Sequence, residues 1–510
     1  MKDLLAFILP PAIALCGMRI HRLLLGKGFE DRFGAGLRWA LGLAVGMLIF
    51  TQAALAGALA GFNLAGPLAY SALLWGGVEI CLMFPPAVAQ LKQFKFQLQQ
   101  LWLLLLLPVL FYCWVFGRLS TLEGTLEFDA NAFWVFKAKV LYLEQGSHLL
   151  YWMRQPGLAY AHWDYPLLVP CLYCLDYGVV GGVDEFVNKV WPFWMVVALC
   201  VGVLSLAKVW QRPHPLPVLA VIIFCFLPAT LDFIRREGGT MPMVFFVSLA
   251  VMLLITAIVR ADELYLAAGM LTAVGAAMSK FEGIIFLAVW FCVMLAICRR
   301  RSWLKKHTLR WSALICLLSV LPYLWFRLEK PIAHPESNWW RDGFAAPAAT
   351  FHRFSQVLFL NCGGRFFSSD FFQWQPDAHD HLSWTGKWTG LDIFLNGQLS
   401  ILPWLLLLVL TMVFWKKSTR LAATALCVVI IGVLSILAFT ISCLPAAQNN
   451  LSFIIQFSSS DEVGRYSYPF FIAWFLGLIL LWCETLEPAS LNTPAKSAQG
   501  SISAPRGGLK

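Results

Sequence analysis

Long apolar runs recur along almost the whole chain, and they leave few folds open to it. Mean hydropathy is +0.71, and only 13% of the 510 residues are charged, whereas a soluble domain has about 25%. A run of roughly 20 apolar residues crosses a bilayer as a helix. Thirteen runs approach that length, at residues 4–18, 40–62, 67–88, 101–116, 190–206, 216–234, 241–259, 264–278, 283–298, 311–326, 399–414, 422–442 and 469–482. The sequence therefore predicts an all-α polytopic membrane protein.

The distribution of Lys and Arg sets the expected orientation, because cytoplasmic loops carry the excess. With 13 transmembrane helices, one alternate set of loops, which includes the C-terminal tail, holds 22 of the 38 basic residues, and the other set holds 21 of the 28 acids. We therefore expect the N-terminus outside, the C-terminus in the cytoplasm and two large loops on the outer face. Topology then explains the net charge of +10, so nucleic acid is not expected as a partner.

These spans divide the chain into six expected segments. They are four N-terminal transmembrane helices (1–117), a first outer loop (118–189), transmembrane helices 5–10 (190–326), a second outer loop (327–398), transmembrane helices 11–13 (399–485) and a disordered cytoplasmic tail (486–510). The first apolar run is interrupted by Pro10-Pro11, so we interpret it as a retained helix rather than a signal peptide.

The first outer loop contains an amphipathic pattern over residues 131–145. Four apolar side chains recur at helical spacing, namely Ala132, Phe136, Val140 and Leu143. We expect a helix in the membrane interface, anchored by Phe133 and Trp134. Asp129 stands just before it, and one interpretation of that carboxylate is an N-cap.

Polar groups near the membrane level are costly, so they are candidates for chemistry. In the first outer loop they form two short elements, Glu127-Phe128-Asp129 and His162-Trp163-Asp164-Tyr165-Pro166. Further charges close the outer ends of later helices: Arg235, Arg236, Glu237, Lys280, Glu282 and Arg465. Each one alone could be a snorkelling anchor. Together, the basic members predict an anion site at the interface, and a lipid-linked phosphate suits Arg and Lys.

The order of these features resembles the integral-membrane type C glycosyltransferases. The pattern is most similar to the bacterial protein O-mannosyltransferases and to the aminoarabinose transferases that modify lipid A. The resemblance covers roughly residues 100–330, and it implies that Asp129 is the catalytic acid of the first loop and that residues 162–168 form the second element. It also implies a bacterial inner membrane, with the active site facing the periplasm.

The chain departs from that pattern at two places. Relatives often have Glu directly after the catalytic Asp, whereas this chain has Ala130, so Asp164 is our candidate for a second carboxylate, with Glu127 behind it. The Lys-Pro-Pro of the aminoarabinose type is replaced by Asp164-Tyr165-Pro166.

The expected reaction moves a sugar from a polyprenyl phosphate to a glycan, lipid or protein acceptor. Such a transfer needs a base and positive charge for the leaving phosphate. We assign Asp129 as the base of an inverting displacement. Arg235, Arg236, Lys280 and Arg465 are assigned to the donor phosphate, and Glu127, His162, Tyr165, Glu237 and Glu282 support the site.

No cofactor is required by this chemistry, but a divalent metal is an alternative. Asp129, His162 and Asp164 offer oxygen and nitrogen ligands that suit zinc or manganese. A second group, Asp377-Ala378-His379-Asp380-His381 in the later loop, offers the same ligand types. For Tyr165 and Pro166 the simpler interpretations are an interfacial aromatic and a helix start.

Three other functions remain open from the sequence. One is a transporter or flippase of lipid-linked sugars, which would place polar residues at the bilayer midplane, where Glu79 is the main example. Another is an O-antigen ligase or polymerase, with the basic residues of the second outer loop at its centre: Arg341, His352, Arg353 and Arg365. The last is a noncatalytic scaffold. Disulfides among Cys171, Cys174, Cys362 and Cys443 are also left open.

Overall fold

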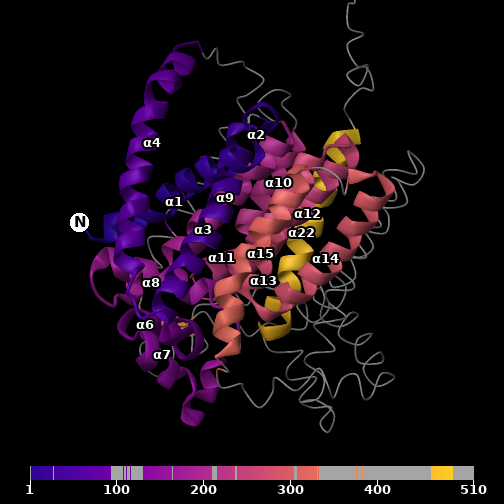
Figure 1. Cartoon of the computed structure of the whole chain (residues 1–510). Coiled ribbons are helices and arrows are strands. Elements are labelled where there is room, and N and C mark those ends of the chain that lie inside the picture. The colour runs from indigo at the N-terminus through magenta and orange to yellow at the C-terminus, as the bar shows by residue number, and fades with distance from the viewer. Residues whose placement is uncertain are drawn as a thin grey trace, which may run out of the picture.

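The computed structural model is a bundle of helices (Figure 1). It describes residues 2–26, 28–93, 130–163, 165–208, 215–235, 238–303, 307–329 and 461–485, with isolated positions at 107, 109, 111, 115, 331, 375–376 and 382–383. Three of the predicted apolar runs, at 101–116, 399–414 and 422–442, lie wholly or mostly outside these residues.

The elements follow one another in a simple order. The helices are α1 (Lys2–Leu25), α2 (Gly28–Arg32), α3 (Ala35–Leu59), α4 (Ala65–Gln93), the π-helix η2 (Ala130–Val135), α6 (Phe136–Leu143), α7 (Gly146–Met153), the 3₁₀ helix η3 (Pro156–Ala161), α8 (Leu168–Val180), η4 (Glu185–Val187), α9 (Val190–Leu206), α10 (Pro215–Phe226), α11 (Pro228–Arg235), α12 (Thr240–Arg260), α13 (Glu263–Ser279), α14 (Phe281–Arg300), α15 (His307–Leu328) and α22 (Asp461–Thr485). The strands β1 (Gln375–Pro376) and β2 (Leu382–Ser383) form an antiparallel pair. The chain is therefore mostly helical, as its apolar runs predict.

Seven helices in the described part of the chain are long and apolar enough to cross a membrane. They span Lys2–Leu25, Ala35–Leu59, Ala65–Leu82, Glu185–Leu206, Thr240–Arg260, Phe281–Arg300 and Leu309–Leu328. Five of them contain a predicted run, and Ala35–Leu59 and Ala65–Leu82 overlap the runs at 40–62 and 67–88. The predicted runs at 216–234 and 264–278 also form helices, but shorter ones, and the run at 469–482 lies within α22.

The run at 216–234 is two helices rather than one. α10 ends at Phe226, and α11 begins at Pro228. Proline has no backbone N–H and disfavours helical geometry in the residue before it. The hydropathy pattern passes over this break because Leu227 and Pro228 do not interrupt the apolar run.

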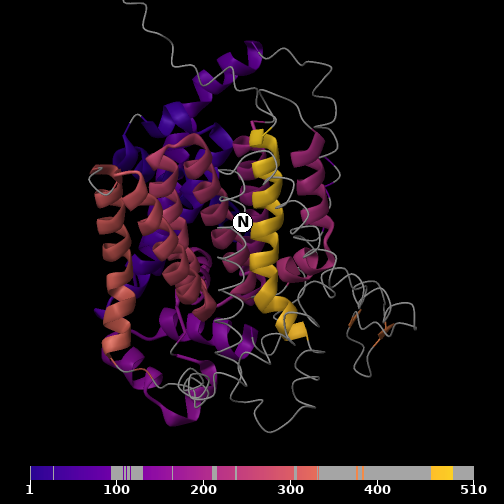
Figure 2. The ribbon, with the colours of Figure 1, turned by 90° about the vertical axis from the view of Figure 1, so that its right-hand side faces the viewer.

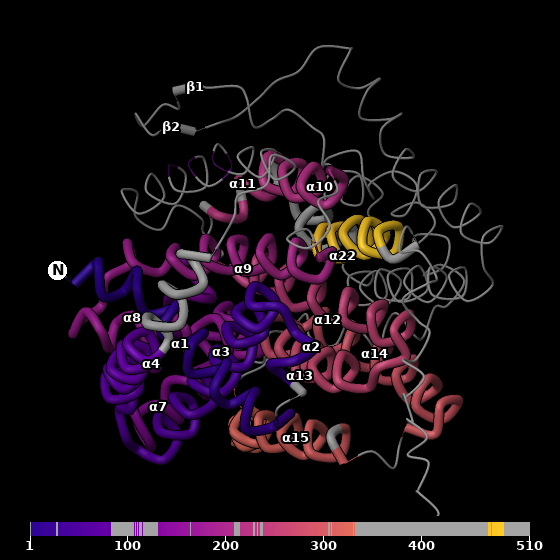
Figure 3. Tube along the Cα trace, turned by 90° about the horizontal axis from the view of Figure 1, so that it is seen from above, coloured from indigo at the N-terminus to yellow at the C-terminus, as the bar shows by residue number. Residues whose placement is uncertain are grey.

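Close packing of α1 on α3 holds the N-terminal part of the bundle together. A Cβ atom on Gly17 would lie 1.9 Å from the carbonyl oxygen of Gly42, and one on Gly42 would lie 2.3 Å from that of Ala14. Small residues allow helix backbones to approach this closely inside a membrane. α12 is the most deeply buried of the candidate spans and packs on α13 and α22. Figure 2 shows α22 running alongside the other long helices, and Figure 3 shows α15 beside α13.

The bundle has two distinct ends (Figure 1). One, which we call the α6 end, carries η2, α6, α7 and the turn at 162–165. The other, the α2 end, carries α2, which an Arg32–Asp262 ion pair fastens to the start of α13. The short connections between consecutive helices alternate between these ends: α12 joins α13 at the α2 end, and α13 joins α14 at the α6 end.

Candidate functional site

Three segments that are distant in the sequence meet at Gly239, at the α6 end. A Cβ atom on Gly239 would lie 3.1 Å from the Trp134 ring of η2 and 3.1 Å from the carbonyl oxygen of Ser279 at the end of α13. Gly238 also lies against the Trp134 indole. Glycine at position 239 therefore lets the first loop, the α11–α12 connection and the α13–α14 turn come into contact.

The α13–α14 turn carries two of the predicted site residues. Lys280 is extended, with φ −154° and ψ 159°, and separates the two helices. Its carbonyl oxygen accepts a hydrogen bond from the Gly283 N–H at 3.0 Å. A Cβ on Gly283 would lie 1.9 Å from the Ala276 carbonyl oxygen, so the tight turn requires glycine there.

Lys280 and Glu282 are both nearly buried, at 8% and 5% exposure. The Lys280 Nζ atom lies 4.0 Å from Glu282 Oε1. Glu282 Oε2 is buried and has no hydrogen-bond partner among the described residues. A charge pair held at this depth is costly unless other groups compensate it, so the turn has the character of a functional position rather than of a solvated hairpin.

A fully buried lysine underlies the first-loop part of the site. Lys137 of α6 has no solvent exposure, and its Nζ donates a hydrogen bond to the His162 carbonyl oxygen at 3.0 Å. The same ammonium lies 4.9 Å from the Trp134 ring centroid and 5.8 Å from that of Tyr165. Aromatic faces attract a cation at such distances, so Lys137 joins the helix to the turn that follows it.

His162 begins that turn in the left-handed region, with φ 49° and ψ 54°. This conformation costs a non-glycine residue about 1–2 kcal/mol. Its carbonyl oxygen accepts the Tyr165 N–H at 2.9 Å as well as the Lys137 ammonium. Its ring lies 4.7 Å from Phe133 and 4.8 Å from Tyr165. Two donors and two rings thus hold a turn that the backbone alone disfavours.

Tyr165 connects this turn to the α13–α14 turn. Its ring stacks on Phe281, the first residue of α14, with centroids 6.3 Å apart and planes at 22°. The ring thus packs between protein elements and is partly exposed, and the interpretation of Tyr165 as a membrane-interface aromatic stays a prediction. Pro166 lies two residues before the first residue of α8, as expected of a residue at a helix start.

The start of α22 and the end of α11 approach each other near the same end. The hydroxyls of Tyr468 and Thr230 share a hydrogen bond, and the Tyr468 ring lies 5.2 Å from Phe233. Phe470 lies 6.2 Å from Phe286 of α14. In sequence, Arg235 follows Phe233 by two positions, and Arg465 precedes Tyr468 by three.

Some of the predicted site residues lie in the described part of the chain, and others lie outside it. His162, Tyr165, Lys280 and Glu282 are described and belong to one connected cluster. Glu127, Asp129, Asp164, Arg236 and Glu237 lie outside the described residues, as do the side chains of Arg235 and Arg465. Asp164 lies in the sequence between Trp163 and Tyr165.

The structure describes some, but not all, of the predicted metal ligands and of the cysteines that could form disulfides. No group of three His, Cys, Asp or Glu side chains that could hold a metal occurs in the described part of the chain. Two members of the proposed triad, Asp129 and Asp164, and all of the 377–381 group lie outside it. Cys171 and Cys174 are free, buried thiols of α8, and Cys362 and Cys443 lie outside the described residues.

The helix after Asp129 is present, but its orientation differs from the expected one. Trp134 is 5% exposed and packs inside the protein, so its predicted role as a membrane anchor is wrong. Lys137 lies on the buried side, whereas Leu143 is 62% exposed. The packing of Trp134 against Gly239 determines which side of the helix faces the protein. The helical spacing of residues 131–145 does not identify Lys137, Trp134 or Gly239 as members of the site. The one indication in the sequence is that Lys137 lies among apolar residues.

The class that these elements indicate is a helical membrane protein, since seven helices of the described residues are long and apolar enough to cross a bilayer. Comparison with protein-family models, curated proteins and solved structures gave no significant match.

Proposed function

We propose that this protein is a glycosyltransferase that moves a sugar from a polyprenyl-phosphate donor to a glycan, lipid or protein acceptor. The observation that supports it most strongly is the cluster at the α6 end. There the turn carrying His162 and Tyr165 packs on the turn carrying Lys280 and Glu282. A polar first-loop element and a phosphate-binding cation are the two parts that such a reaction needs.

The proposed reaction is an inverting displacement. The acceptor hydroxyl attacks the anomeric carbon of the sugar, the bond from that carbon to the phosphate oxygen breaks, and Asp129 takes the hydroxyl proton. Lys280, with Arg235, Arg236 and Arg465, holds the leaving phosphate. Asp164 and Glu127 supply further carboxylates, and His162, Tyr165, Glu237 and Glu282 support them. A divalent metal on Asp129, His162 and Asp164 is the alternative way to stabilise the phosphate.

The proposed setting is a bacterial inner membrane with 13 transmembrane helices. The N-terminus and the α6 end face the periplasm, and the C-terminus lies in the cytoplasm. The excess of acids over bases in the loops assigned to the outer side, 21 against 16, supports this orientation.

A purified-protein assay tests the function. The protein is incubated with polyprenyl-phosphate sugars and an acceptor hydroxyl, and released polyprenyl phosphate is measured. Asp129→Asn should lower turnover by about 10²–10⁴-fold, because Asn cannot accept the proton, while donor binding is retained. Full turnover in this variant would remove Asp129 as the base.

Asp184→Asn is the matched control. Asp184 lies in the same predicted loop and caps η4 through the Phe186 N–H, and Asn is an equally good cap. Its turnover should equal that of the unmodified protein. A transporter of lipid-linked sugars would leave the sugar–phosphate bond intact in every variant.

A further inference from the structure

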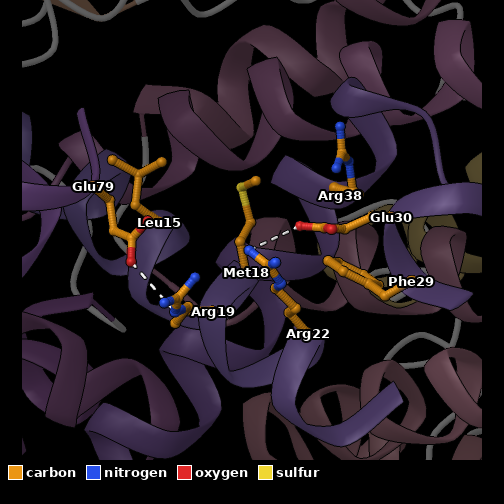
Figure 4. Close-up of a pocket in the computed structure, with 8 residues that line it drawn as sticks. All are labelled: Leu15, Met18, Arg19, Arg22, Phe29, Glu30, Arg38 and Glu79. Atoms are coloured by element: carbon orange, nitrogen blue, oxygen red, sulfur yellow. Dashed lines mark ion pairs between the residues drawn. The ribbon is translucent and has the colours of Figure 1, made fainter. Parts of the chain in front are cut away.

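A second charged site lies at the α2 end, away from the proposed transferase site. A cavity of about 110 Å³ is lined by Arg19 and Arg22 of α1, Glu30 of α2, Arg38 of α3 and Glu79 of α4. Figure 4 shows these side chains on the two sides of Met18. Four helices therefore contribute charge to one small cavity.

The cavity carries more positive than negative charge. Arg19 Nε lies 3.7 Å from Glu79 Oε1, and Arg22 Nη1 lies 3.1 Å from Glu30 Oε1. These are the two ion pairs drawn in Figure 4. Arg38 is the third cation, and its Nε atom is buried without a hydrogen-bond partner among the described residues. A buried N–H group of this kind favours an additional acceptor.

The surroundings of Glu79 indicate where that acceptor comes from. On α4, Glu79 is flanked by Val78, Ile80 and Leu82, which are all exposed. Exposed apolar side chains on a membrane-spanning helix face lipid tails. A ligand at this place would therefore meet arginines and apolar helix surface together, which suits a lipid with a negatively charged head.

We propose that this cavity binds the phosphate group of an anionic membrane lipid. Arg38 donates to a phosphate oxygen through its buried Nε, and Arg19 and Arg22 surround the phosphate with positive charge. Planar guanidinium groups suit phosphate oxygens, and basic pockets between transmembrane helices are known to recognise lipid head groups. Glu79, the intramembrane acid, then has a defined role: it pairs with Arg19 and competes with the phosphate for that guanidinium. The proposal stands independently of the transferase activity.

The test is native mass spectrometry of the full-length protein titrated with phosphatidylglycerol and, separately, with phosphatidylcholine. Arg38→Gln should weaken phosphatidylglycerol binding by about tenfold or more, the effect of one charge-assisted hydrogen bond. Arg300→Gln is the matched control, because Arg300 is exposed and ends α14 at the same end of the bundle. It should change binding less than about twofold. Equal phosphatidylglycerol binding by the Arg38→Gln variant and the unmodified protein would overturn the proposal.

A variant with the opposite expected sign guards against simple misfolding. Glu79→Gln removes a carboxylate that competes for Arg19, so phosphatidylglycerol should bind more tightly, whereas a merely structural ion pair would give equal or weaker binding. Inorganic phosphate distinguishes the source of the anion. Phosphate should compete only weakly, because it lacks the acyl chains. If phosphate bound in an Arg38-dependent way and phosphatidylglycerol did not, the lipid assignment would be wrong.

Discussion

Lys137 shows what one buried charge does in this molecule. It has no contact with solvent, and it donates to the carbonyl oxygen of the strained His162. We expect Lys137→Met, which keeps most of the side-chain volume, to destabilise the protein by about 1.5–3 kcal/mol, the value of a hydrogen bond to a charged group. The measurement is the free energy of unfolding in detergent.

Lys139→Met is the control for that substitution. Lys139 lies two positions along the same helix and forms a partly exposed ion pair with Glu185, a type of contact worth about 0–1 kcal/mol. If the two variants lost equal stability, Lys137 would be no more than an ordinary surface lysine in energetic terms.

Lys280 allows a second prediction at the residue scale. If its ammonium holds the donor phosphate, Lys280→Gln should weaken polyprenyl-phosphate binding by about tenfold or more, since a charge-assisted hydrogen bond is lost. Glu282→Gln removes the other member of the pair and should not weaken binding, because it takes away negative charge. Titration with a fluorescent polyprenyl phosphate measures both. A purely structural ion pair would leave binding unchanged in both variants.

Sequence reasoning identified Lys280 and Glu282 as site candidates, because charge is costly in an apolar chain, but it did not identify Lys137. The periodicity of residues 131–145 predicts a helix correctly, yet it cannot say which side faces the protein. The side that faces the protein is set by two contacts: Trp134 packs on Gly239, which is distant in the sequence, and Lys137 donates to His162 in a separate turn. Local pattern therefore gives the element, and tertiary packing gives its rotation.

At the scale of elements, the α13–α14 hairpin depends on one missing Cβ. Gly283→Ala would place a methyl group 1.9 Å from the Ala276 carbonyl oxygen, so one helix must move. We expect a loss of about 1–3 kcal/mol or more, together with reduced donor binding, because Lys280 and Glu282 lie on the displaced turn. Unfolding in detergent and polyprenyl-phosphate titration measure the two effects.

Gly77→Ala is the matched control within α4. Apart from the backbone of its own helix, no atom of the described residues lies within 4 Å of a Cβ at that position, and alanine is favoured over glycine in a helix by about 0.5–1 kcal/mol. This variant should be as stable as the unmodified protein or more so. If Gly283→Ala behaved in the same way, the hairpin would not require the close approach.

Apolar runs predicted most described helices, but not α8 and not the α10–α11 break. α8 has 13 residues, about 20 Å of helix, which is short of the roughly 30 Å of a bilayer core. Hydropathy therefore assigns it to the first loop, although it is buried against α4 and α6. Such a helix owes its burial to neighbouring protein, which no local average of hydropathy reports.

For the whole molecule, the orientation is the property on which the proposed periplasmic site depends. Ser147 and Ser302 are exposed residues near opposite ends of the bundle, Ser147 on α7 and Ser302 just after α14. In intact cells, a membrane-impermeant maleimide should label Ser147→Cys, because the α6 end faces outward. Ser302→Cys should be labelled only after the membrane is permeabilised. The unmodified protein gives the background from Cys81 and Cys292, the exposed native thiols of the described residues. The reverse labelling pattern would place the α6 end in the cytoplasm and would contradict the orientation that the positive-inside bias predicts.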